Sequence, residues 1–211
     1  MKSQQPLQVR ALAVLAMGYL VSLLAYPKLP GPFLEQKVSA RILVAFTLPT
    51  TALIIYALFR SLWKHDRIRT GNGAFEFTYH TIVLRVLLFV VALHGLVMMG
   101  LTGAMNALGF RLSAGRAVVV LLGVVLVAIG NLLPRTRPNV AVGIRTRRTL
   151  SNGQLWQQVH RAGGYATVGL GIVVALTGLV LTHEALGAVI GAAALFAAMT
   201  VLFSYRRYAR G

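Results

Sequence analysis

The polar residues best suited to chemistry are concentrated in one basic segment, residues 135–161, which lies between two long apolar runs. Cations near a membrane attract anionic lipid headgroups by roughly 1 kcal/mol each. Pro134 and Pro138 stop the preceding helix and hold the chain that leaves it extended. The amide of Asn131 then lies at the end of that helix, where it could pair with exposed carbonyl groups. The segment is either a folded binding element or a solvated loop that only enforces topology.

Two further polar residues, Arg85 and His94, lie inside an apolar run, where polar side chains are costly. Arg85 would cost about 2.5–3.5 kcal/mol at the centre of a spanning helix, but it is close to the start of the run. Its long stem favours a guanidinium that reaches the headgroups; a buried partner and a bound anion are the alternatives. His94 has no histidine or carboxylate three or four residues away. A hydrogen bond to a neighbouring helix is therefore favoured over a ligand role.

Signatures of catalysis are missing from the sequence. The chain has four acidic residues, five histidines and no cysteine. It lacks the H-E-x-x-H, G-x-S-x-G and G-x-x-x-x-G-K-[ST] motifs, and the spacing of its histidines and acids does not predict a metal site. We therefore expect no enzymatic activity, no catalytic residues, no metal and no cofactor.

Apolar runs dominate the rest of the chain. Of its 211 residues, 57% are hydrophobic and 12% are charged, and the mean hydropathy is +0.73. A helix crosses a membrane with about 20 apolar residues, so the sequence predicts an all-α polytopic membrane protein of about six spans. Pro49, flanked by threonines, should kink the second span. The predicted spans are residues 7–26, 42–63, 81–105, 117–134, 163–182 and 185–204.

The distribution of Lys and Arg predicts the orientation. With the N-terminus inside, 15 of the 21 basic residues lie on the cytoplasmic side, five lie outside, and Arg85 lies within a span. Cytoplasmic segments are enriched in Lys and Arg, so both termini and residues 135–161 are expected in the cytoplasm. In a membrane protein, a formal charge of +17 favours anionic headgroups as partners over direct contact with nucleic acid.

A short amphipathic helix is expected after the fourth span. Ser151 or Asn152 can cap it, and it should run to about residue 162. Within it Leu155 and Val159 share one face, and Trp156 and His160 share a neighbouring face. Tryptophan is common at the headgroup level, so we expect this helix to lie in the membrane interface and to lead into the fifth span.

The same segment resembles the signature of the SdpI family of bacterial membrane proteins. Many residues match at fixed spacing: Gly130, Asn131, Pro134, Asn139, Gly143, Ile144, Arg145, Thr146, Thr149, Leu150, Asn152, Trp156, His160 and Arg161.

The N-terminal part resembles the domain that often precedes that signature. Residues 26–30 match its Y-P-x-L-P opening, but the His and Gly pattern that usually follows is not matched in the short stretch 31–40, which contains Glu35 instead. The expected division is a three-helix membrane region over residues 1–115 and an SdpI-like three-helix region over residues 116–211.

The resemblance implies a function in the bacterial cell membrane. The family's namesake protects its producer from a secreted antimicrobial peptide and holds a cytoplasmic repressor at the membrane. By this analogy Arg145 would bind a carboxylate or lipid phosphate. Asn131, Asn139 and Asn152 would hold the loop in one shape, and Trp156 and His160 would dock the short helix. Such an antimicrobial peptide and such a repressor are the expected partners, besides membrane lipids.

Two other classes of protein fit the sequence. A small carrier or lipid-handling protein would use Arg85, Arg145 and the other intramembrane polar groups, such as His94, to bind an anionic solute or lipid phosphate. Its support is a faint repeat, in which Leu-Thr-Gly at residues 101–103 recurs at residues 176–178. A membrane scaffold without a ligand is the third class.

Overall fold

The chain folds into long helices joined by short connections. The computed structural model describes residues 5–29, 38–70, 76–139, 141–180 and 183–209, and among these it has no β-strand. Four short elements are η1 (Tyr26–Lys28), α5 (Ala104–Ala107), η2 (Leu133–Arg135) and α7 (Arg147–Ser151). The long helices are α1 (Gln5–Ala25), α3 (Val38–Thr70), α4 (Glu76–Leu101), α6 (Ala114–Gly130), α8 (Gly153–Val180) and α9 (His183–Ala209).

Five of the long helices are long and apolar enough to cross a membrane. The sixth predicted span falls in α9, whose described apolar part is Ala193–Leu202. Large apolar side chains point outward from the bundle, among them Leu43, Ile54 and Phe196, which are 65%, 62% and 69% exposed. Exposed apolar surfaces of this kind are stable in contact with lipid. Together with the long apolar helices, they confirm the prediction of an all-α polytopic membrane protein.

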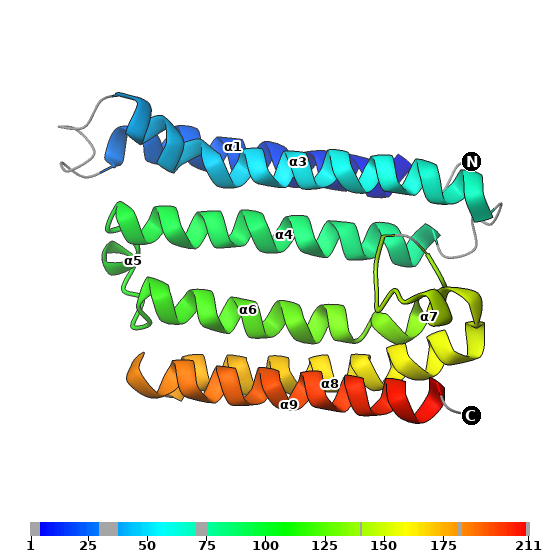
Figure 1. Cartoon of the computed structure of the whole chain (residues 1–211). Coiled ribbons are helices and arrows are strands. Elements are labelled where there is room, and N and C mark those ends of the chain that lie inside the picture. Colours follow the sequence, from blue (N-terminus) through cyan, green and yellow to red (C-terminus); the bar gives the residue numbers. More distant parts are fainter. Residues whose placement is uncertain (1–4, 30–37, 71–75, 140, 181–182, 210–211) are drawn as a thin grey trace.

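The helices form two groups that meet at α4 and α6 (Figure 1). Helices α1 and α3 pack on α4, while α8 packs on both α6 and α9. The start of α1, the end of α9 and α7 lie at one end of the bundle, which we call the α7 end; α5 lies at the other (Figure 1). The charge distribution predicts that the α7 end is cytoplasmic.

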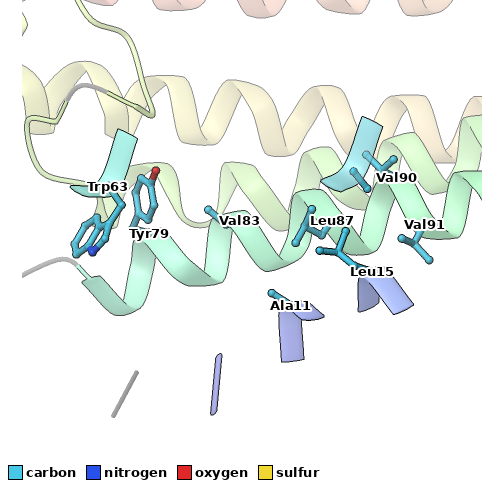
Figure 2. Close-up of a cluster of buried hydrophobic side chains, with 9 residues drawn as sticks. Ala11, Leu15, Trp63, Tyr79, Val83, Leu87, Val90 and Val91 are labelled. Carbon is cyan, nitrogen blue, oxygen red and sulfur yellow. The ribbon is translucent and has the colours of Figure 1, made fainter. Parts of the chain in front are cut away.

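Apolar side chains fill the space between α1, α3 and α4 (Figure 2). Leu15, Tyr79 and Leu87 are at most 4% exposed there, and Trp63 is 7% exposed. Two residues of the segment between α6 and α8, Ala141 and Val142, also pack against this cluster. The connecting segment therefore touches the core of the N-terminal helices.

Glycines at seven-residue spacing bring α6 and α8 into backbone contact. A Cβ atom on Gly171 would lie 2.6 Å from the carbonyl oxygen of Gly123, and one on Gly164 would lie 2.8 Å from that of Gly130. Small residues allow this approach, which maximises van der Waals packing between helices in lipid. Next to the seam, the Arg116 Nε donates to the carbonyl oxygen of Gly178 at 3.0 Å, at the end of α8. The arginine thereby pairs with a carbonyl that the helix end leaves open.

Three helices meet in a hydrogen-bonded junction next to Pro49 of α3. A proline in a helix removes the partner of the carbonyl four residues earlier, here that of Ala45. The Ser22 hydroxyl of α1 donates to this oxygen at 2.5 Å. It also lies 2.9 Å from the His94 Nε2 of α4. The prediction that His94 bonds to a neighbouring helix is confirmed, and its partner is Ser22, which no pattern in the sequence indicates.

Candidate functional site

The candidate site is the segment between α6 and α8, residues 131–152, together with the first three turns of α8. At its start Asn131 is the C-cap residue of α6 and its side chain is exposed. The ring of Pro134 in η2 then packs against α8 at Gly164, where a Cβ atom would lie 2.9 Å from the ring. The glycine therefore makes room for the turn by which the chain leaves α6.

Asn139 shapes the middle of the segment with its side-chain amide. The Oδ1 atom accepts the backbone N–H groups of Ala141 and Val142 at 2.9 and 2.7 Å. The Nδ2 atom donates to the carbonyl oxygens of Arg137 and Val142 at 2.6 and 3.0 Å. Asn139 is 2% exposed, so a non-helical turn is satisfied internally rather than by water. This is the role expected of an asparagine here.

Trp156 and His160 hold the segment onto α8. Their rings stack with centroids 3.9 Å apart and planes at 15°, and both side chains are fully buried. The Trp156 indole N–H donates to the carbonyl oxygen of Thr136 at 3.0 Å. The His160 Nε2 accepts the backbone N–H of Ile144 at 2.9 Å, and its Nδ1 donates to the carbonyl oxygen of Trp156 at 2.8 Å. An accepting Nε2 requires the neutral imidazole with its proton on Nδ1.

Gly143 allows the chain to pass directly over these rings. Its φ of +118° is a conformation that side chains strongly disfavour. A Cβ atom there would also collide with the His160 Nε2 and lie 3.1 Å from the Trp156 ring. Only glycine fits both the backbone angle and the space.

Hydroxyl and amide caps complete the scaffold. Thr146 and Thr149 form a reciprocal capping box at the start of α7, and the buried Thr149 hydroxyl donates to the carbonyl oxygen of Ile144 at 2.8 Å. Asn152 caps α8, since its Oδ1 accepts the backbone N–H of Leu155 at 3.0 Å. Of the two predicted cap residues, Asn152 and not Ser151 performs this role.

One expectation about this region is wrong. The predicted short helix is present as the N-terminal part of α8, which runs without a break from Gly153 to Val180 and so leads directly into the fifth span; a further short helix, α7, precedes it. Trp156 does not lie among the lipid headgroups, because it is fully buried beneath the segment. The amphipathic pattern predicts a helix whose apolar face contacts lipid, but the segment between α6 and α8 covers that face.

The surface of this scaffold is strongly basic. The arginines have exposed side chains, whereas Asn139, Thr149, Trp156 and His160, which hold the fold, are buried. Guanidinium groups on a fixed frame bind carboxylates or phosphates. A hollow of about 640 Å³ opens beside them, lined in part by Arg137, Asn152 and Gln157. The six exposed arginines are Arg135, Arg137, Arg145, Arg147, Arg148 and Arg161.

The intramembrane candidates lie apart from this surface. Arg85 does not follow the favoured prediction of reaching the headgroups: its guanidinium donates to the carbonyl oxygen of Ala128, in the last turn of α6. An open carbonyl at a helix end is a nearer partner than a headgroup, and the bond offsets the helix dipole. His94 is held by Ser22 in the N-terminal helices. Among the described residues no three His, Asp or Glu side chains cluster as metal ligands would.

Some residues that build the site cannot be recognised from their type and spacing alone. Thr136 contributes its backbone oxygen to Trp156, a role that its residue type does not reveal. Gly164 and its contact with Pro134 depend on how α6 and α8 pack. Pro134 and a glycine on the next helix are both evident in the sequence, but the sequence does not show that the two lie close together.

The fold and the site define a polytopic α-helical membrane protein that presents a folded, arginine-rich segment at one end of its bundle. Residues 135–205 match the model of the SdpI/YfhL protein family, so this part of the chain is similar to that family. The match covers most of the candidate site and continues through α8 into α9. Comparison with curated proteins and with solved structures finds no match.

Proposed function

We propose that this protein is a membrane immunity and signalling protein. It protects the cell from a membrane-active antimicrobial peptide and uses the segment between α6 and α8 to hold a cytoplasmic repressor. The observation that supports this proposal is the basic surface just described. It consists of six exposed arginines on a segment whose polar side chains are hydrogen-bonded within the protein. A rigid frame lowers the entropy lost on binding, which favours recognition of an acidic protein surface.

The two activities are coupled through the bundle in this proposal. The peptide is met in the bilayer or at the α5 end, and the repressor is met at the α7 end. Ala141 and Val142 pack against the apolar core of α1, α3 and α4, so a shift of those helices changes the support of the segment. An effector acts in this way only if it binds two arrangements of the bundle with different affinity.

A survival assay tests protection. Cells that express the wild type are challenged with a panel of membrane-active peptides, and Arg145→Ala is compared with Arg111→Ala, an exposed arginine near the α5 end. We expect Arg145→Ala to abolish repressor recruitment or protection while its amount in the membrane stays unchanged, and Arg111→Ala to behave like the wild type. Full protection together with full repressor recruitment in Arg145→Ala would remove that residue from the proposed surface. Equal killing with and without the wild-type protein would remove the immunity function.

A labelling experiment tests the side of the membrane. The chain has no cysteine, so Arg147→Cys introduces a unique thiol on α7. A membrane-impermeant maleimide should label it in inverted vesicles and not in intact cells. Labelling from outside intact cells would contradict a cytoplasmic partner.

The hydrogen bonds of two intramembrane side chains argue against the carrier alternative. Arg85 is hydrogen-bonded to Ala128 and His94 to Ser22, so both side chains serve contacts between helices. A solute at either position would have to break such a contact.

A further inference from the structure

A second candidate site lies among α1, α3 and α4 near the α7 end, away from the segment that carries the arginine-rich surface. A cavity of about 170 Å³ opens there between the three helices. Pockets for drug-sized ligands are usually about 300–1,000 Å³, so this cavity fits a group of headgroup size. Its lining includes Gln8, Tyr56, Arg60, Trp63, Lys64 and Tyr79.

Aromatic rings form a fixed wall of the cavity. Trp63 packs against Tyr79 with ring centroids 4.8 Å apart, and the Phe59 ring meets Tyr79 edge-on at 6.0 Å. The Tyr79 hydroxyl donates to the carbonyl oxygen of Phe59 at 2.6 Å, which ties α4 to α3. In Figure 2 the Trp63 and Tyr79 rings lie side by side at one end of the apolar cluster. Amphipathic aromatic rings are enriched at the depth where headgroups meet acyl chains.

Two cations line the same cavity. Arg60 and Lys64 are four residues apart on α3, so they lie on one face of the helix, and both are exposed. The Arg60 guanidinium also donates to the Tyr56 hydroxyl at 3.4 Å. A pair of cations beside an apolar, aromatic wall is complementary to an anionic group attached to an apolar chain.

We infer that this cavity binds the phosphate headgroup of an anionic phospholipid from the leaflet at the α7 end. Arg60 and Lys64 contact the phosphate, and the glycerol region lies against the aromatic wall. The acyl chains follow the exposed apolar side chains of the neighbouring helices, such as Leu12 and Leu58, which are 54% and 55% exposed. A lipid is favoured over a soluble anion because the cavity lies where a spanning helix reaches the headgroups and because its wall is largely aromatic and aliphatic.

The position of the cavity gives the lipid a structural consequence. Ala11, Trp63, Tyr79 and Val83 line the cavity and also belong to the core cluster against which the segment between α6 and α8 packs. A lipid bound there fastens α1, α3 and α4 together beside that segment. This inference does not depend on the proposed immunity function.

Lipid binding by the purified full-length protein tests the inference. The protein is reconstituted in phosphatidylcholine vesicles, and phosphatidylglycerol with brominated acyl chains is titrated in while tryptophan fluorescence is recorded. Arg60→Gln/Lys64→Gln is compared with Arg111→Gln/Arg206→Gln, which removes two exposed cations that lie away from the cavity. We expect saturable quenching that requires roughly thirtyfold more phosphatidylglycerol in the first variant, as the loss of two lipid-facing cations predicts, and no change in the second.

Three outcomes would overturn the inference. Equal weakening in both double variants would mean that general surface charge attracts the lipid. Unchanged quenching in Trp63→Phe would mean that the lipid does not contact this wall. Inorganic phosphate that protects against quenching in the wild type but not in Arg60→Gln/Lys64→Gln would assign the site to a soluble anion. Circular dichroism of each variant confirms that an altered response does not come from unfolding.

Discussion

The indole nitrogen of Trp156 donates to the carbonyl oxygen of Thr136 at 3.0 Å, which joins the start of α8 to the chain that has just left α6. Both residues are buried, and the Trp156 ring also stacks on His160. This bond fixes the two ends of the candidate site relative to each other. The arginines of the segment therefore have a defined arrangement only while it is intact.

Trp156→Phe is expected to loosen the segment without removing the stacked ring. The change leaves the Thr136 carbonyl buried and unpaired, which costs about 1–3 kcal/mol. Hydrogen exchange of the backbone at residues 141–149 should become faster, whereas exchange in α4 should stay unchanged. Gln157→Ala, at an exposed position one residue further on, is the control. Unchanged exchange in Trp156→Phe would mean that the bond does not hold the segment.

Gly143→Ala should disrupt the same site from the opposite side. The new Cβ atom would be forced into a disfavoured backbone angle and into the His160 ring, at a cost of about 1–3 kcal/mol for the strained backbone alone. Gly153→Ala is the matched control, since a Cβ atom there would meet nothing within 4 Å. Limited proteolysis in detergent should cleave the Gly143→Ala segment faster than that of the wild type. Equal cleavage of both alanine variants would contradict the assigned role of Gly143.

Gly171→Ala should weaken the packing of α6 on α8. The Cβ atom would lie 2.6 Å from the carbonyl oxygen of Gly123, and overpacking of this kind costs about 1–3 kcal/mol. Gly169→Ala is placed two residues away on the same helix, where the added atom meets nothing within 4 Å. The free energy of unfolding, measured by titration with a denaturing detergent, should fall only in Gly171→Ala. A similar loss in both variants would indicate helix propensity rather than close packing.

Ser22→Ala and Pro49→Ala should be strongly coupled. Ser22→Ala leaves the Ala45 carbonyl without a partner, because Pro49 has no N–H to offer it. In a Pro49→Ala background the restored N–H can pair with that carbonyl. Ser22→Ala should then cost less there, by about 0.6–1.7 kcal/mol, the range measured for hydrogen bonds between membrane helices. A double-mutant cycle of unfolding free energies measures this difference, and additive costs would show that Ser22 does not compensate for the proline.

Some structural features could be predicted because they follow from local chemistry. The Asn152 cap, the turn around Asn139 and the shared faces of Leu155, Val159, Trp156 and His160 depend on residue types at short spacing. The predicted spans all fall on long helices, because a run of apolar residues is also a local property of the sequence. The end of α4 was placed too late, at residue 105 rather than Leu101, because the apolar run continues through a turn into α5.

Other features required distances across the bundle. Arg85 was expected at the headgroups, but its partner Ala128 is 43 residues away in the chain. The pairing of Ser22 with Ala45 and His94 joins three helices. No pattern within one helix reveals which backbone carbonyl on another helix lacks a partner.

The sequence by itself determined that the chain is a polytopic membrane protein, roughly where its long apolar helices lie, and where its basic segment falls, because hydropathy and charge act residue by residue. Only the tertiary structure decided that this segment is a folded element and which of its residues face outward. Trp156 and His160 become buried because Gly143 lets the chain pass over them and because Gly164 and Gly171 let α6 approach α8. Contacts of this kind depend on the packing of helices against one another, which composition and spacing along one chain do not specify.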